Sequence, residues 1–190
     1  MSTRCPSIAS VCLVIFLLAA VDLAMAHDTV WPGDKLQILA PAAASFEQRN
    51  LYLADQQRQR LEAALGTALP VEDLQPSIYF SIVKKTPDGP SKRDEVILFV
   101  DADGKEGKIE IGSVITGQGR LARVHLFENK EDQSLVAADF LGQFSGKSAA
   151  EPFVVGRDIT APAGQEESAR AIAAAVRRSL LLVEELFRRR

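Results

Sequence analysis

The sequence predicts an α+β domain in which an antiparallel β-meander is covered by helices. Four runs rich in Ile, Val and Phe follow one another in the middle of the chain, and short turn-forming segments separate them. Because a parallel strand pair needs a crossover of a dozen or more residues, these short connections imply antiparallel hairpins. Apolar residues at helical spacing before and after the four runs indicate the helices that cover the sheet.

The first 26 residues have the pattern of an export signal. Arg4 precedes an apolar run from Ile8 to Val21, and Ala24-Met25-Ala26 is a small-residue cleavage motif. The run is shorter than the roughly 20 residues that a membrane-spanning helix needs. We therefore expect cleavage after this motif and a single periplasmic or otherwise exported domain over residues 27–190. An uncleaved signal that anchors the chain in a membrane is the alternative.

The composition of the expected mature domain argues against several kinds of site. Both cysteines, Cys5 and Cys12, lie in the signal, so neither a disulfide nor a cysteine metal site is expected after cleavage. The formal net charge of −3 is spread along the chain, so the sequence does not indicate a basic surface for nucleic-acid binding. The basic cluster at residues 188–190 follows the last expected helix, where positive charge complements the helix dipole.

The elements are expected in the following order. A helix begins near Asp55, a plausible N-cap, and ends at Gly66. Turn-forming residues then separate the strands at Thr86–Pro90, at Asp103-Gly104 and at Gly117–Gly119. The four expected strands are Ile78–Lys84, Glu95–Val100, Ile109–Thr116 and Leu121–Phe127.

Two amphipathic helices are expected after the strands. The first, Gln133–Phe144, would place Val136 and Phe140 on the same side as Phe144. The second, from Glu166 to about Arg188, has an apolar stripe that should cover one face of the sheet. A stripe of this kind is usually part of a core and does not indicate a function. Its members are Ala169, Ile172, Val176, Leu180, Val183 and Phe187.

The most specific motif of the chain lies between Phe144 and Arg178. Phe144-Ser145-Gly146-Lys147 is followed by Asp158, then by Ala163-Gly164-Gln165-Glu166, and then by a helix with small residues. This order resembles the C-terminal end of the FMN-binding domain family, which includes the periplasmic flavin subunits of the sodium-translocating NADH:quinone reductase and of Rnf-type complexes. The meander and its preceding helix are similar to the family's as well, although they are less specific.

The resemblance implies electron transfer by an FMN whose phosphate lies at the N-terminus of the last helix, a position that suits anions. Glu166 stands in place of the threonine to which the family's flavin is esterified, and Gln165 replaces the alanine before it. We therefore expect the flavin to be bound noncovalently. The cofactor-binding residues that the resemblance implies are Lys147, Arg157, Asp158, Gly164, Gln165, Glu166, Ser168 and Arg170.

The expected function is that of an exported redox accessory or electron carrier whose partner is a membrane redox complex or another exported redox protein. Glu166 and Glu167 would repel a phosphate within contact distance by about 1–4 kcal/mol per charge pair. The alternative is therefore a flavin-free interaction subunit that keeps the scaffold and docks on such a complex or on another exported partner.

Three further patterns indicate no chemistry. Gly142-x-x-x-Gly146-Lys147-Ser148 is one residue short of a P-loop, and Asp101-x-Asp103-Gly104 lacks the later ligands of a calcium loop, so we interpret it as a hairpin turn. His27 and His125 are the only histidines, and nothing in their spacing indicates a copper site. No catalytic triad or metal motif is found, so we expect electron transfer or binding rather than catalysis.

Overall fold

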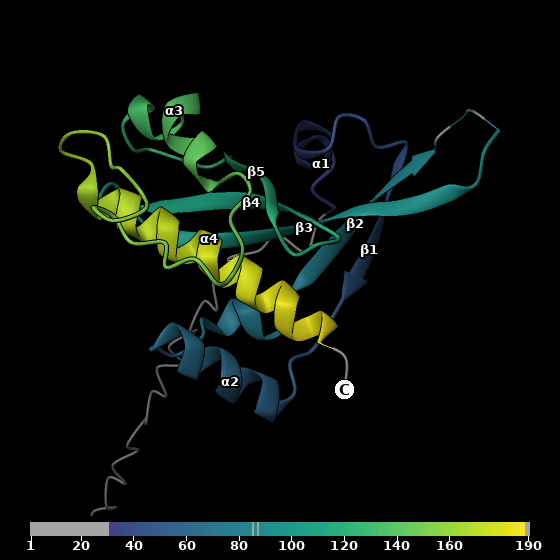
Figure 1. Ribbon diagram of the computed structural model, residues 1–190, viewed down its shortest axis with the longest axis horizontal. Coiled ribbons are helices and arrows are strands. Elements are labelled where there is room, and N and C mark those ends of the chain that lie inside the picture. The colour runs from purple at the N-terminus through teal and green to yellow at the C-terminus, as the bar shows by residue number, and fades with distance from the viewer. Residues whose placement is uncertain (1–30, 85, 87, 189–190) are drawn as a thin grey trace, which may run out of the picture.

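The computed structural model describes residues 31–84, 86 and 88–188, and it confirms the α+β fold. Each of the five strands is antiparallel to its sequence neighbour, so the sheet is a simple meander (Figure 1). The strands are β1 (Ser45–Asn50), β2 (Ser77–Lys84), β3 (Ser91–Asp103), β4 (Lys108–Thr116) and β5 (Leu121–Leu126).

β1 is not predicted from the sequence, and β3 is longer at both ends than the predicted strand Glu95–Val100. β1 has the sequence SFEQRN, which lacks an apolar run, and it pairs with β2 from Ser45 opposite Ile82 to Asn50 opposite Ser77. The first residues of β3 are polar, but they continue the ladder with β2 up to Ser91 opposite Lys84. The two strands thereby form an arm that projects beyond the helices (Figure 1). Backbone pairing, rather than side-chain burial, defines both of these segments.

Four α-helices and three short 3₁₀ helices complete the described part of the chain. The α-helices are α1 (Asp34–Leu39), α2 (Asp55–Leu65), α3 (Ala138–Leu141) and α4 (Glu166–Phe187). The 3₁₀ helices are η1 (Val71–Leu74), η2 (Gln133–Leu135) and η3 (Gly142–Phe144). Within this part of the chain, no helix is both long enough and apolar enough to cross a membrane. The expected signal and His27 lie outside the described residues.

The boundaries of α2 correct one expectation and confirm another. Asp55 is the first helical residue rather than the N-cap, and Ala54 occupies the cap position. The Oε1 atom of Gln57 accepts a hydrogen bond of 2.9 Å from the backbone N–H of Ala54, so a glutamine two residues after Asp55 closes this helix end. Gly66 ends α2 with a φ of 74°, as expected.

The expected helix Gln133–Phe144 is wrong, because the segment is broken into η2, α3 and η3. Asp132 caps η2, since its side chain accepts a hydrogen bond of 2.8 Å from the N–H of Ser134. The helix is interrupted at Ala137, which is extended. Phe140 and Phe144 are buried nevertheless, with ring centroids 5.5 Å apart. The two aromatic side chains are therefore buried as expected, although the backbone that carries them is not the continuous helix that was predicted.

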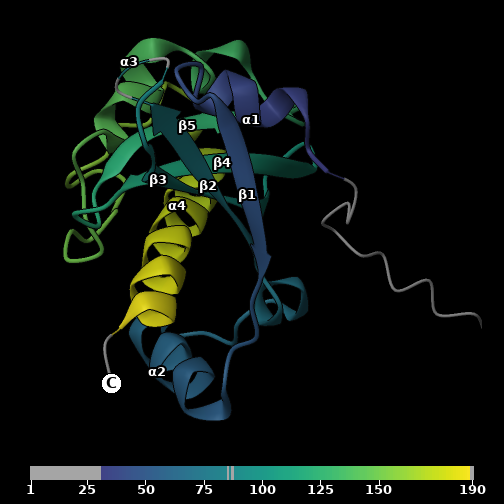
Figure 2. The same cartoon turned by 90° about the vertical axis from the view of Figure 1, so that its right-hand side faces the viewer.

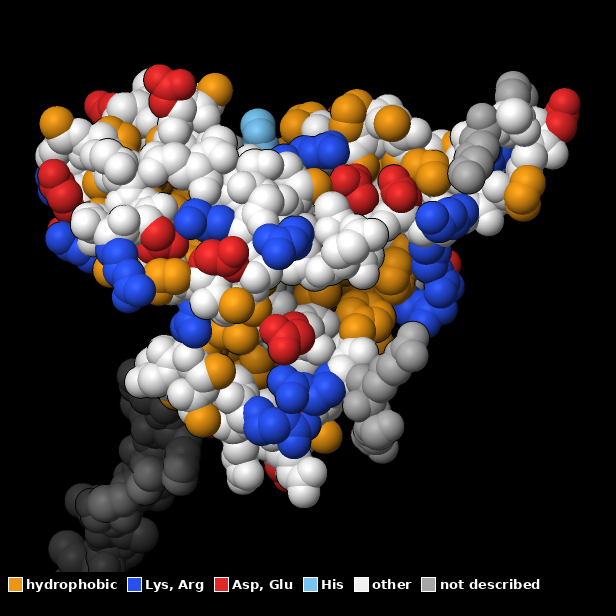
Figure 3. All heavy atoms as spheres, viewed as in Figure 1, with side chains coloured by type: hydrophobic (Ala, Val, Ile, Leu, Met, Phe, Trp, Pro, Cys, Tyr) orange, Lys and Arg blue, Asp and Glu red, His pale blue; other side chains and the backbone are white. Residues whose placement is uncertain are grey.

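α4 covers one face of the sheet, as expected. Its stripe is buried from Ala169 to Val183, and the hydroxyl of Ser179 donates to that of Ser113 on β4 at 2.9 Å. Phe187, the last residue of α4, is the exception, because it is 46% exposed. In Figure 3, hydrophobic side chains gather beside this end of α4, below the arm. α2 packs against the same end of α4 (Figure 2).

α1 covers part of the opposite face. Leu36 and Leu39 are fully buried there against Tyr79, Ile97 and Phe99. This contact depends on a glycine in β4, since a Cβ atom at position 112 would lie 2.7 Å from a methyl group of Leu39. The sheet is thus buried on both sides, by a long helix on one face and by a short helix on the other.

Candidate functional site

The first turn of α4 is the place where the resemblance puts the phosphate. Gly164 precedes it with a φ of 76°, a conformation that favours glycine, and the N–H of Gln165 closes the turn onto the carbonyl of Pro162 at 3.0 Å. Gln165 is the N-cap residue, and its side chain does not cap the helix. Glu166 and Glu167 then bring two carboxylates to the positive end of the helix dipole.

Ser168 is buried and serves an internal contact. Its hydroxyl donates a hydrogen bond of 2.7 Å to Glu131 and accepts one of 3.1 Å from the N–H of Lys105. Glu131 also accepts a hydrogen bond of 2.7 Å from the N–H of Glu106. These four residues, which we term the Glu131 clamp, bind the β3–β4 turn to the start of α4. Sequence reasoning missed Glu131, because an acidic residue in a polar loop carries no signal of burial.

Lys147 and Asp158 form an ion pair of 2.9 Å, and both side chains are largely buried. Asp158 also accepts hydrogen bonds from the N–H groups of Val154 at 2.7 Å and Phe153 at 3.2 Å. Burial opposes ionisation, but the hydrogen bond and charge of Lys147 and the two backbone donors outweigh it and lower the pKa of Asp158 below its ordinary value. The positive charge of Lys147 is thus balanced within the chain.

Phe153 has the only positive φ, 56°, of the described residues that are not glycine. Its ring is buried and stacks on Phe144 with centroids 6.2 Å apart, while the Lys147 ammonium lies 5.8 Å from its centroid. Such a backbone conformation costs free energy and persists only where the surroundings impose it. The ring stacking and the hydrogen bond from its N–H to Asp158 hold Phe153 in this conformation.

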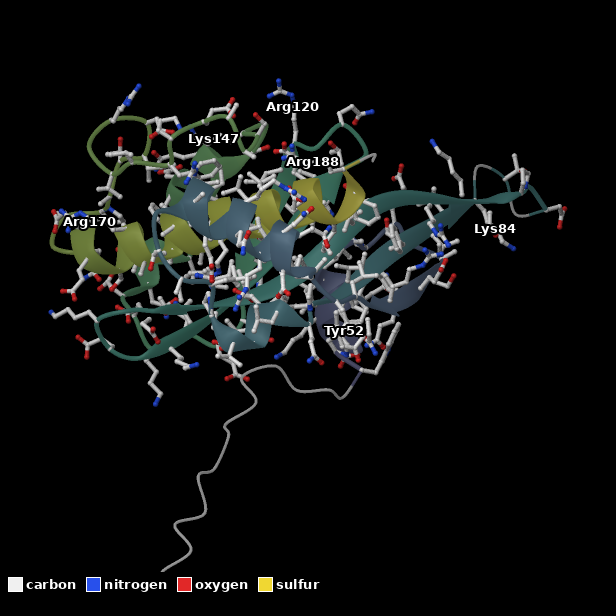
Figure 4. The ribbon with its side chains drawn as sticks, turned by 90° about the horizontal axis from the view of Figure 1, so that it is seen from below. Tyr52, Lys84, Arg120, Lys147, Arg170 and Arg188 are labelled. Atoms are coloured by element: carbon white, nitrogen blue, oxygen red, sulfur yellow. The ribbon has the colours of Figure 1, made fainter. Side chains whose placement is uncertain are left out.

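The remaining expected residues are Arg157 and Arg170, and both are exposed. Arg170 lies at the start of α4, whereas Lys147 lies over another part of the molecule, so these two cations do not converge (Figure 4). Gly164 and Gln165 lie in the turn before α4, and Glu166, Ser168 and Arg170 lie in its first two turns, where Ser168 is buried and Arg170 is exposed. The structure places Lys147 and Asp158 in a separate pair beside Phe153.

The other patterns take structural roles. The hydroxyl and the N–H of Ser148 both donate to Glu151, at 2.5 and 2.7 Å, so a carboxylate occupies the donors of the P-loop-like segment. Asp101 and Asp103, expected in a turn, belong to β3 and pair with Glu110 and Lys108, and the turn to β4 begins at Gly104. The His125 ring lies 4.5 Å from that of Phe127. The described residues include no group of three or more His, Cys, Asp or Glu side chains that could hold a metal ion.

A surface hollow of about 250 Å³ lies beside the middle of α4, between η1 and the facing ends of β3 and β4. Its charged lining includes Glu72, Asp101, Lys108 and Arg178. The Nε atom of Arg178 is 2.7 Å from the Asp73 carboxylate, and its other nitrogen donates to the carbonyl of Asp101. None of the eight expected cofactor-binding residues lines this hollow.

In comparisons with known proteins, no family model and no curated protein matches the chain. The resemblance to the FMN-binding domain family therefore depends on the residues between Phe144 and Arg178.

Proposed function

We propose that the protein is an exported electron carrier or redox accessory that binds FMN reversibly, without a covalent bond. The observation that carries this proposal is the start of α4, a helix of 22 residues whose N-cap side chain makes no capping hydrogen bond and whose preceding glycine has a positive φ. Such an end presents backbone N–H groups and a positive dipole to an anion. The motif resemblance supplies the identity of the anion.

The positions of the hydroxyl groups support a noncovalent complex. Glu166 occupies the position where the family attaches its flavin. The hydroxyl of Ser168, two residues further on, is buried and donates to Glu131. Thr160 lies before the turn and is tied by its backbone to the side chain of Gln143 at 2.7 and 3.0 Å. Neither hydroxyl takes the place of the missing threonine.

Charge determines how tightly FMN binds in this proposal. Helix dipoles stabilise an anion by about 0.3–1 kcal/mol at exposed sites, whereas each carboxylate at contact distance repels it by about 1–4 kcal/mol. Glu166 and Glu167 therefore weaken binding, and Lys147 is already balanced by Asp158. Arg157 and Arg170 are the exposed cations that remain near the motif. We expect weak, reversible binding.

The test is a titration of the purified protein with FMN, followed by quenching of the flavin fluorescence. Replacing both Glu166→Gln and Glu167→Gln should tighten binding at least tenfold, which corresponds to about 1.4 kcal/mol. Glu184→Gln, at the far end of α4 and 58% exposed, is the matched control and should leave the affinity unchanged. Riboflavin, which lacks the phosphate, should not respond to the double substitution. Absence of FMN binding in both the wild type and the double variant would contradict the proposal.

The second candidate is a flavin-free interaction subunit that docks on a membrane redox complex or another exported partner. The pairing of Lys147 with Asp158 favours it, because the chain satisfies its own buried cation. The Oε1 atom of Glu166 also accepts a long hydrogen bond of 3.4 Å from the N–H of Gly164, within the expected phosphate site. An absorption spectrum of the purified protein without flavin bands, together with a failed titration, would establish this candidate over the first.

A further inference from the structure

We propose that the outer edge of β1 pairs with β1 of a second copy of the chain, so that two five-stranded sheets join across a twofold axis. β1 is the terminal strand and hydrogen-bonds to β2 on one side. Within the described part of the chain, no other element pairs with its outer side, which Figure 2 shows along the margin of the sheet. An unpaired edge offers a row of backbone donors and acceptors to another strand. The inference is independent of FMN binding.

The sequence of β1 is complementary to itself. In an antiparallel pair centred on Gln48, Glu47 of each copy lies opposite Arg49 of the other, and the two Gln48 residues face each other. Opposite charges on directly facing residues stabilise a strand pair, and like charges destabilise it. The contact is isologous, as twofold dimers require.

Neighbouring registers lack this match. Side chains alternate between the two faces of a sheet, so only a shift of one strand by two residues keeps each face of the joined sheet continuous. The nearest such shifts centre the strand pair on Glu47 or on Arg49. The first places two glutamates directly opposite each other, and the second places two arginines opposite each other. Among the registers that keep the two faces continuous, the charges therefore favour the one centred on Gln48.

The charged side chains are already held in position on the α4 face of the sheet. Arg93 of β3 reaches across β2 and binds Glu47 through two hydrogen bonds of 2.6 and 2.9 Å. The guanidinium groups of Arg93 and Arg49 lie 4.8 and 5.5 Å from the ring centroid of Phe80. Glu47 also accepts a hydrogen bond of 3.1 Å from Arg49 of its own chain. In the dimer, the partner's Arg49 would lie directly opposite Glu47, so that the two Glu47 and two Arg49 side chains form one cluster of alternating charge.

The first experiment uses Gln48→Cys in a chain whose Cys5 and Cys12 are replaced by Ser. Facing residues of an antiparallel pair have Cα atoms about 4.5–5.5 Å apart, within the span of a disulfide. Mild oxidation should therefore link most of the Gln48→Cys protein as a dimer. The matched control is Asn50→Cys in the same strand. In the proposed register, the cysteines that this substitution introduces into the two copies would lie four residues apart along the strands, about 13 Å, and should not form a disulfide. Equal crosslinking of the two variants, or none at position 48, would overturn the proposal.

The second experiment measures mass by sedimentation equilibrium over a range of concentrations. The wild type should dimerise, whereas Glu47→Arg and Arg49→Glu should each be monomeric, because each brings like charges together. Mixing the two single variants should restore dimers, and so should combining both substitutions in one chain. Glu184→Arg on α4 is the control and should dimerise as the wild type does. A monomeric wild type, or single variants that dimerise as well as the wild type, would refute the β1 interface.

Discussion

The hydroxyl of Ser168 donates a hydrogen bond of 2.7 Å to the carboxylate of Glu131, and both side chains are buried. The contact joins the first turn of α4 to a loop 37 residues earlier in the chain. Among the described residues, no cation pairs with Glu131, so hydrogen bonds alone compensate its burial. A Cβ atom at Gly104 would lie 2.9 Å from the Glu131 carboxyl carbon, so the adjoining turn needs a residue without a side chain.

Ser168→Ala should lower the free energy of unfolding by about 1–3 kcal/mol. The substitution removes the donor to a buried Glu131 oxygen and the acceptor of the Lys105 N–H. Urea denaturation measures the effect as a shift of the midpoint without a change in slope. Ser145→Ala is the control, because that hydroxyl is exposed and donates over 3.3 Å, and its effect should stay within about 0.5 kcal/mol. Equal effects of the two substitutions would mean that the Glu131 clamp contributes nothing.

Gly112→Ala should displace α1 from the sheet. The added methyl would lie 2.7 Å from Leu39 and 2.8 Å from Phe127, and overpacking of this kind costs about 1–3 kcal/mol. Trp31, the single tryptophan, contacts Tyr79 beside α1 with ring centroids 5.7 Å apart, so its fluorescence should shift with the helix. Gly117→Ala in the next turn meets nothing within 4 Å and should leave both stability and fluorescence unchanged. An unaltered Trp31 spectrum in Gly112→Ala would show that α1 accommodates the methyl group.

Val176→Asp should cost about 3 kcal/mol or more, because it buries a charge without a partner under α4. Phe187→Asp changes the last residue of the same stripe, which is half-exposed and contacts Phe80 with centroids 6.0 Å apart. It should cost about 1 kcal/mol. Thermal melts of the two variants compare them directly. A larger loss for Phe187→Asp would mean that the stripe is buried mainly at its end.

Asp158 should make stability depend on pH under acidic conditions. Although its burial raises the pKa, the contacts with Lys147, Val154 and Phe153 lower it further, so the folded pKa lies below that of the unfolded chain. The stabilisation is therefore present above the unfolded value of about 3.9 and is lost as the pH falls through the folded value. Denaturation at several pH values should show a shallower acid dependence for Asp158→Asn than for the wild type. Asp139→Asn, at an exposed position in α3, should retain the dependence of the wild type.

The sequence predicted the strands in the middle of the chain and the last helix because their side chains alternate or repeat with the period of the element. Ile109–Thr116 and Glu166–Phe187 are examples in which burial and backbone structure coincide. β1 was not predicted because it is an edge strand of the described sheet and none of its side chains is fully buried. The segment 133–144 was predicted as one helix because Phe140 and Phe144 are correctly spaced, but Ala137 is extended and separates η2 from α3.

The candidate site was predictable only in part. Gly164 and the acidic first turn of α4 could be located from the sequence, since glycine before a helix and carboxylates at its start are local features. The pairing of Lys147 with Asp158 and of Ser168 with Glu131 joins residues 11 and 37 positions apart through loops without periodicity. Only the fold reveals which of these polar groups are used internally.

The order of the elements, with α4 after all five strands, has a consequence for biosynthesis. All five strands are complete before Glu166 is added, so the face that contains Ile78, Leu98 and Ile111 stays without its cover until α4 has been synthesised. Exposed apolar surface in a partly made chain promotes aggregation. We therefore expect the nascent chain to need protection from aggregation until α4 is available. A chain that stops before α4 would be a substrate for chaperones and proteases rather than a shorter form of the protein.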